Sequence, residues 1–217
     1  MSHTQLVVPA AAIARSSALS LLSQKTGGKP ITVALPPGTF NHQVFLLIDC
    51  SGSMVGAKLN QAIAGALDFA ESARRSGYKI GLISFASQAH VLCPATEDLP
   101  QLKNALAGLI AGGGTDLAAA LELGGQVLSD DKNHRALCIV SDGFPNADSQ
   151  PRILALAAAI KAKGVDLMVL GTDDADRAFL QRLASSQALA TTVTPQQLRT
   201  GISQMASQLR LSQLPDL

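Results

Sequence analysis

The chain contains no tryptophan, and aromatic residues make up only 3% of its 217 residues. Proteins that bind single-stranded nucleic acid usually stack the bases on aromatic side chains, and this chain offers few such platforms. Charged residues are also scarce, at 15%, and the formal net charge is +1 with no long basic or acidic run. A nucleic-acid-binding domain normally has a basic patch. The sequence therefore predicts no nucleic-acid partner.

Cysteine is rare as well, with Cys50, Cys93 and Cys138 spread far apart along the chain. They form no CxxC pair, so neither a zinc site nor a redox dithiol is indicated. The N-terminus has no basic segment ahead of a long apolar stretch, and no segment approaches the ~20 apolar residues that span a bilayer. We therefore expect a cytoplasmic protein in a reducing compartment, with no membrane span.

Hydrophobic residues make up 47% of the chain, which is ample for a core. Several apolar runs are continuous, as in parallel strands that are covered on both faces, rather than alternating with polar residues. The predicted strands are Val44–Ile48, Ile80–Phe85, Leu137–Val140, Val165–Leu170 and the weaker Ala188–Val193. A short edge strand over His90–Cys93 is expected to pair antiparallel with Ile80–Phe85.

Between these strands, apolar residues recur at the three- and four-residue spacing of helices. The predicted helices cover Leu59–Ala73, Leu99–Leu109, a segment from Leu117 onward, Ile153–Ile160 and Leu198–Leu209 with Pro195 at its start. Asp116 and Asp148 stand where helices should begin, and Gly77 and Gly164 where they should end. This alternation predicts an α/β fold with a doubly wound, mostly parallel sheet flanked by helices on both faces.

Residues 1–40 do not fit the alternation, and we treat them as an N-terminal extension to a domain over residues 41–213. Ala10–Leu22 has the composition of a helix, and Ile31–Leu35 that of a short strand. A covering element, an added edge strand and a partner-binding arm all remain open for this extension.

Oxygen-bearing side chains follow two of the predicted strands. Asp49, Ser51 and Ser53 come directly after the first strand, Asp142 follows the third, and Thr115 follows a run of three glycines. Ligands of open α/β sheets bind beyond the carboxyl ends of the strands, where such loops converge. Hydroxyl and carboxylate oxygens suit Mg²⁺, so the five residues predict a divalent-cation site. Taken singly, the serines would also suit a helix N-cap, and Asp142 a turn.

The pattern Asp49-x-Ser51-x-Ser53, followed in order by Thr115 and Asp142, resembles the metal-ion-dependent adhesion site (MIDAS) of von Willebrand factor type A (VWA) domains. The resemblance covers roughly residues 43 to 211. It implies that Ser51 and Ser53 ligate the metal directly, that Thr115 does so directly or through water, and that Asp49 and Asp142 act largely through water. The metal implied is Mg²⁺, with Mn²⁺ or Ca²⁺ as alternatives.

The resemblance also implies a non-catalytic adaptor domain in which a glutamate or aspartate of a partner protein completes the metal's coordination. The chain looks similar to intracellular bacterial VWA proteins, including those associated with tellurite resistance, which implies an AAA-type ATPase or a stress-response complex as partner. The alternative is a magnesium-dependent phosphatase or phosphotransferase that uses Asp49 as nucleophile. Haloacid-dehalogenase-like enzymes need a carboxylate where this chain has Ser51, and their lysine has no evident counterpart in Lys58 or Lys132.

Overall fold

The computed structural model describes residues 42–128, 133–143, 149–172 and 175–211. The predictions for residues 1–40, for Asp148 and for Lys132 lie outside these residues. Within the described residues, no helix is both long enough and apolar enough to cross a membrane.

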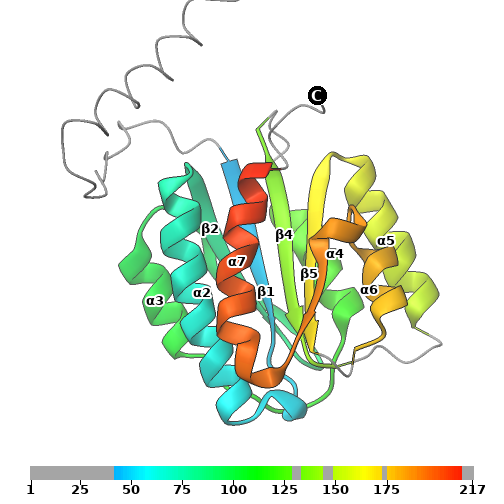
Figure 1. Ribbon diagram of the computed structural model, residues 1–217, viewed down its shortest axis with the longest axis horizontal. Coiled ribbons are helices and arrows are strands. Elements are labelled where there is room, and N and C mark those ends of the chain that lie inside the picture. The colour runs from blue at the N-terminus through cyan, green and yellow to red at the C-terminus, as the bar shows by residue number, and fades with distance from the viewer. Residues whose placement is uncertain (1–41, 129–132, 144–148, 173–174, 212–217) are drawn as a thin grey trace, which may run out of the picture. The chain divides into compact units, whose positions relative to one another are not determined.

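One six-stranded sheet runs through the domain (Figure 1). Its strands are β1 (His42–Asp49), β2 (Tyr78–Phe85), β3 (Ala89–Thr96), β4 (Arg135–Ser141), β5 (Val165–Thr172) and β6 (Ala190–Val193). Their order is β3-β2-β1-β4-β5-β6, and only the β2–β3 pair is antiparallel. The predicted doubly wound, mostly parallel sheet with an antiparallel edge strand is therefore confirmed.

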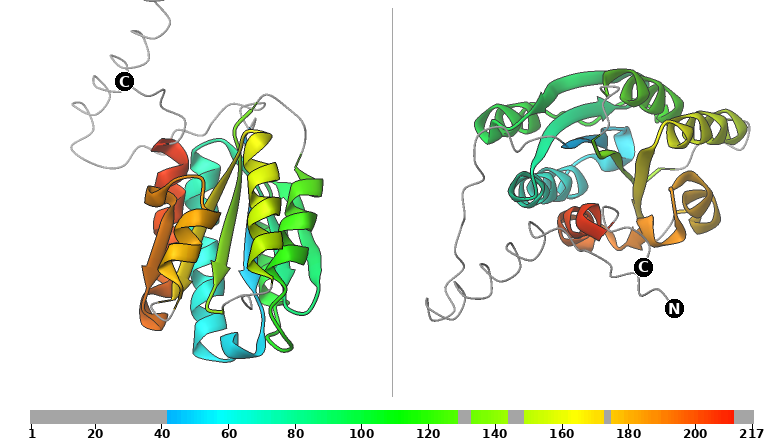
Figure 2. Two further views of the ribbon diagram at one scale, coloured as in Figure 1. Left: turned by 90° about the vertical axis from the view of Figure 1, so that its right-hand side faces the viewer. Right: turned by 90° about the horizontal axis from the view of Figure 1, so that it is seen from above.

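Helices cover both faces of this sheet (Figure 2). They are α2 (Ala57–Arg75), α3 (Leu99–Ala107), α4 (Leu117–Val127), α5 (Gln150–Ala162), α6 (Arg177–Leu183) and α7 (Leu198–Leu211). Three 3₁₀ turns are η1 (Gly52–Met54), η2 (Gln187–Leu189) and η3 (Pro195–Gln197). The sequence patterns did not predict α6, and the first two residues of the predicted Ala188–Val193 strand belong to η2.

Successive side chains of β1 enter two separate cores because strand side chains alternate between the faces of a sheet. Val44, Leu46 and Ile48 pack in the core with α2, α3 and α7, whereas Phe45 and Leu47 pack with α4, α5 and α6. All five side chains are buried. This two-sided burial explains why the strand is a continuous apolar run.

The predicted helix ends agree with the local geometry. The Asp116 carboxylate accepts the backbone N–H of Ala119 at 3.0 Å and caps α4. Gly77 and Gly164 follow α2 and α5 with φ of 84° and 72°, in the left-handed region that glycine adopts without a steric cost.

Helix α7 lies beside α2, as Figure 1 shows. A Cβ added to Gly65 on α2 would lie 2.8 Å from the backbone oxygen of Arg199 on α7, so the two helices approach closely at this glycine. Near the other end of α7, the Tyr78 hydroxyl on β2 donates a hydrogen bond to the backbone oxygen of Leu209 at 3.1 Å. These contacts join α7 to both α2 and the sheet.

Strand β3 forms one edge of the sheet and is longer than the predicted His90–Cys93 segment. Its pairing with β2 shifts register twice, between the Ile80 and Leu82 pairs and between the Leu82 and Ile83 pairs. Pro94 lies within this strand.

Candidate metal site

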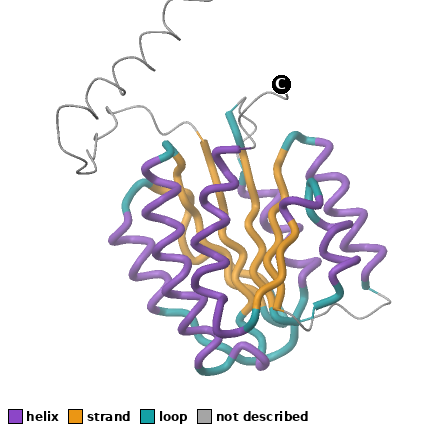
Figure 3. The backbone as a smooth tube through the Cα atoms, viewed as in Figure 1, coloured by secondary structure: helices purple, strands orange, loops and turns teal. Residues whose placement is uncertain are grey.

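The order in which strands are added to the sheet changes direction at its centre. Strand β1 lies between β2 and β4, and the chain builds outward from it in both directions. In open α/β folds this switch point leaves a crevice at the carboxyl ends of the strands. Asp49 ends β1, and Asp142 directly follows β4, so these two carboxylates flank the switch point. Figure 3 shows loops gathered at this edge of the sheet.

The Asp49 side chain is fixed by its own loop and by β4. It is fully buried, and its Oδ1 accepts the backbone N–H of Ser51 at 2.8 Å. Its Oδ2 accepts a hydrogen bond from the Ser141 hydroxyl. Burial raises the pKa of Asp49 above its usual value, hydrogen bonds from Ser141 and Ser51 oppose the rise, and the charge of Asp142 adds to it. The carboxylate is thus held in place but poorly solvated.

A chain of hydrogen bonds links the other predicted ligands. The hydroxyls of Ser51 and Ser53 lie 2.9 Å apart, and Ser53 Oγ donates to Asp142 Oδ1 at 2.7 Å. Asp142 Oδ2 accepts a hydrogen bond from Lys58 Nζ on α2. Asp142 is therefore contacted by both the loop after β1 and the start of α2, more than 80 residues away in the sequence.

Thr115 enters this site next to Gly143. A Cβ added to Gly143 would lie 3.3 Å from Thr115 Oγ1 and 3.7 Å from Asp49 Oδ2. The threonine hydroxyl and the Asp49 carboxylate therefore both lie close to Gly143, which has no side chain to fill the space beside them. All five sequence-predicted residues lie at the same edge of the sheet.

Backbone hydrogen bonds hold the contributing loops together. Gly52 N–H donates to the Gly113 oxygen at 3.0 Å, and Gly112 N–H donates to the Cys50 oxygen at 2.7 Å. Asp116 N–H donates to the Ala86 oxygen at 2.6 Å. Backbone hydrogen bonds thus hold the loop after β1 against the glycine-rich loop before α4.

The capping alternative for the serines does not fit this geometry. The N-cap of α2 is Gly56, and neither that cap nor Ser51 at the start of η1 makes a side-chain capping hydrogen bond. The hydroxyls of Ser51 and Ser53 instead point to each other and to Asp142.

Two residues of the site were not assigned a role from the sequence. Ser141 and Lys58 act through contacts that span 92 and 84 residues, so their partners could not be inferred from the neighbouring sequence. Lys58, for which the sequence suggested no placement, lies directly against Asp142.

The donor set fits a hard divalent cation. It offers two carboxylates and three hydroxyls, and oxygen ligands are those that Mg²⁺ prefers. In the part of the chain that the structure describes, no three His, Cys, Asp or Glu side chains gather as a metal-binding group. The fit is therefore to a hydroxyl-rich site rather than to a nitrogen or sulfur site of the zinc type.

Nucleophilic chemistry is not favoured by this geometry. Asp49 is fully buried, and each of its oxygens accepts a hydrogen bond from the protein, which leaves it little access to an incoming phosphate. Burial and then the charge of Asp49 raise the pKa of Cys50 to about 11, which keeps the thiol protonated at neutral pH.

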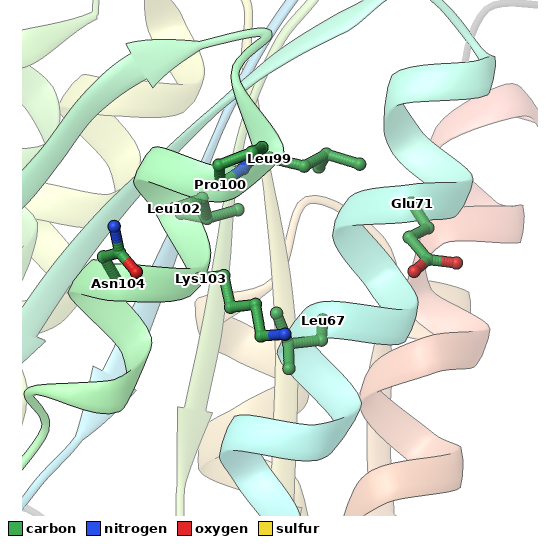
Figure 4. Close-up of a pocket in the computed structure, with 7 residues that line it drawn as sticks. All are labelled: Leu67, Glu71, Leu99, Pro100, Leu102, Lys103 and Asn104. Carbon is green, nitrogen blue, oxygen red and sulfur yellow. The ribbon is translucent and has the colours of Figure 1, made fainter.

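A separate groove of about 390 Å³ lies between α2 and α3 and contains none of the five residues. It is lined by Leu67, Glu71, Leu99, Pro100, Leu102, Lys103 and Asn104 (Figure 4). The candidate metal site is thus a feature of the sheet edge and is separate from this groove.

Comparison with known proteins supports a VWA domain. Residues 44–144 match the family model described as von Willebrand factor type A domain. The vWF domain of the type V pili tip protein Mfa5 from Porphyromonas gingivalis shares the fold with a TM-score of 0.70, at 15% identity over 81% of this chain and 97% of that one. The fold is therefore a von Willebrand factor A-like fold.

Two further proteins are similar to this chain. The magnesium-chelatase 60 kDa subunit of Cereibacter sphaeroides is 31% identical over 166 residues, which cover 67% of this chain and 28% of that subunit. This chain thus spans less than a third of that relative's length. Proximal thread matrix protein 1 from the mussel byssus, solved with a zinc-occupied MIDAS motif, aligns with a TM-score of 0.62 at 16% identity, over 76% of this chain and 46% of that one.

Proposed function

We propose that this domain is a non-catalytic binding module that recognises an acidic residue of a partner protein through a divalent cation. The observation that carries the proposal is the convergence of Asp49, Ser51, Ser53, Thr115 and Asp142 at the switch point of the sheet. A bound cation, Mg²⁺ in the first place, would supply an electrophilic centre to which a partner's carboxylate can bind.

The chain's own residues would prepare that centre. Ser51 and Ser53 offer hydroxyl ligands, Thr115 a third, and Asp49 and Asp142 compensate the charge from buried positions. Hydrogen bonds from Ser141 and from the backbone of Ser51 hold Asp49 in one orientation. Because few of the ligands are anionic, the cation retains affinity for an incoming carboxylate.

Apolar side chains beside the site support a protein partner. Val55, just after η1, is 63% exposed, and Ile110, just before the glycine-rich loop, is 84% exposed. Val91 and Leu92 on β3 are the other large apolar side chains that are exposed in the described residues. Two of these four thus belong to the loops of the site, where a partner would bury them.

The partner's identity is a narrower proposal. The similarity to a magnesium-chelatase subunit that is much longer than this chain favours a domain that works inside a larger assembly. An AAA-type ATPase or a stress-response complex, as in tellurite-resistance-associated VWA proteins, is the class of partner that we propose to test first.

Isothermal titration of the chelator-treated protein with Mg²⁺ and Mn²⁺ tests the metal site. We expect saturable one-site binding that the double variant Ser51→Ala, Ser53→Ala loses while its circular dichroism is unchanged. Equal binding by this variant would contradict the assignment of the serines as ligands.

Affinity capture with the domain as bait, in Mg²⁺ and in chelator, tests the partner step. We expect retention only with metal, and a loss of at least tenfold with Ile110→Ser although Mg²⁺ affinity is unchanged. A partner that is retained equally in chelator would rule out recognition through the cation.

A further inference from the structure

Lys58 occupies a position that is unfavourable for a lysine by local criteria. It is the second residue of α2, in the first turn of the helix, and no acidic residue stands in that turn. The partial positive charge at a helix N-terminus disfavours a cation there. A contact outside the helix can offset this cost.

That contact is the ion pair with Asp142. The Asp142 side chain has no exposed surface, whereas the Lys58 side chain is 30% exposed. Water can therefore reach the Lys58 side chain of the pair but not the Asp142 side chain. Breaking such a pair by removing one partner leaves a buried charge uncompensated, so the aspartate depends on a cation.

The same carboxylate belongs to the proposed metal site, since its Oδ1 accepts a hydrogen bond from Ser53. We propose that Lys58 is a tethered cation that competes with the divalent cation for Asp142 and thereby sets the metal affinity of the site. This inference rests on the proposed function and adds to it a residue that determines affinity.

The charges explain the competition. When both are ionised, Asp49 and Asp142 carry two negative charges, and the Lys58 ammonium compensates the one on Asp142. A divalent cation compensates both, so a lysine that stayed in place would leave an excess positive charge and repel the metal. The long stem of Lys58 and its exposure to solvent let the ammonium leave, at the cost of its bond to Asp142.

The test compares Lys58→Met with Lys103→Met by isothermal titration of the chelator-treated proteins with Mg²⁺. Lys103 is exposed on α3, so its substitution makes the same change of net charge away from the site. We expect Lys58→Met to bind Mg²⁺ about tenfold more tightly than the unsubstituted protein, which corresponds to ~1.4 kcal/mol. Lys103→Met should bind as the unsubstituted protein does.

A second readout is the melting temperature without metal. Lys58→Met should melt lower than the unsubstituted protein in chelator, because Asp142 loses its cation, and should gain more from saturating Mg²⁺. Lys58→Gln, which keeps a hydrogen-bond donor for Asp142, replaces the methionine variant if that variant does not fold.

The outcomes separate this inference from the proposed function. Tighter binding by the Lys58 variant, or binding by it alone, supports the competition. If both proteins bind Mg²⁺ with equal affinity, or the variant binds more weakly, Lys58 is not a competitor although the metal site stands. If neither protein binds any divalent cation, the inference and the proposed metal site both fail.

Discussion

Asp49 combines complete burial with a raised pKa, and the sign of that shift has a consequence for stability. A raised pKa means that the folded state holds the proton more tightly than the unfolded chain does. The stabilisation is fully present below the unfolded pKa and is lost as pH rises through the folded pKa. Without metal, the ionised form of Asp49 therefore lowers the stability of the fold, a cost that functional sites commonly carry.

Asp49→Asn should raise the melting temperature of the chelator-treated protein by about 2–4 °C at pH 7, which corresponds to ~1 kcal/mol for a chain of this size. The amide keeps an oxygen for the Ser51 N–H and removes the buried charge. Mg²⁺ binding should be lost. Scanning calorimetry at several pH values measures the first effect, and the gain should shrink as pH falls, since Asp49 is then protonated.

Asp116→Asn is the matched control, because it makes the same chemical change next to Thr115. Asparagine caps a helix as well as aspartate does, so α4 should keep its cap. Neither the melting temperature nor Mg²⁺ affinity should change. A lower melting temperature for Asp49→Asn would mean that the ionised carboxylate stabilises the fold.

The sequence predicted all five proposed ligands, and missed the supporting contacts that Ser141 and Lys58 make to two of them. Asp49 and Asp142 are recognisable because an apolar run stops just before each of them. Lys58 reads as an ordinary surface residue of a helix, and only the folded chain brings it to Asp142. That the five proposed ligands bind a metal stays a prediction.

At the scale of elements, the close approach of α2 and α7 depends on Gly65, which has no side chain. A Cβ at Gly65 would meet the Arg199 oxygen at 2.8 Å and Ile202 Cβ at 3.0 Å. The first of these atoms is backbone and cannot turn aside. Any side chain at this position therefore forces the two helices apart.

Gly65→Ala should lower the free energy of unfolding by about 1–3 kcal/mol, as overpacking does. Urea denaturation measures this free energy of unfolding. Gly125→Ala on α4 is the control, because its nearest neighbour is the Ile160 side chain at 3.3 Å, which can adjust. The better helix propensity of alanine should leave Gly125→Ala neutral or up to about 1 kcal/mol more stable. Equal effects of the two substitutions would show that the α2–α7 contact has no special constraint.

Strands were easier to predict than the short elements around them. The buried strands β1, β2, β4 and β5 carry the continuous apolar runs of a two-sided core. Helix α6 has only seven residues, too few to show a helical period, and its signal is the capping aspartate Asp176. The length of β3 depends on pairing with β2 and not on its own, largely exposed residues.

At the scale of the whole molecule, metal binding should be measurable as stability. A ligand that binds only the folded state at 100 times its dissociation constant stabilises it by about 2.7 kcal/mol. For a chain of this length we expect a rise in melting temperature of about 5–11 °C with Mg²⁺, reversed by chelator. Thermal scans of the protein and of Asp49→Asn make the comparison, and an equal rise in both would indicate binding elsewhere.

The edge strand β3 affects how the molecule behaves at high concentration. An unpaired strand edge with exposed apolar side chains, here Val91 and Leu92, is a template for aggregation. Pro94 has no N–H to offer a further strand, and the two register shifts interrupt the regular edge. At the opposite edge, β6 is only four residues long. Both edge strands are thus poorly suited to pair with a strand of another molecule. We therefore expect the exposed apolar side chains of β3 to cause little aggregation through β-sheet extension.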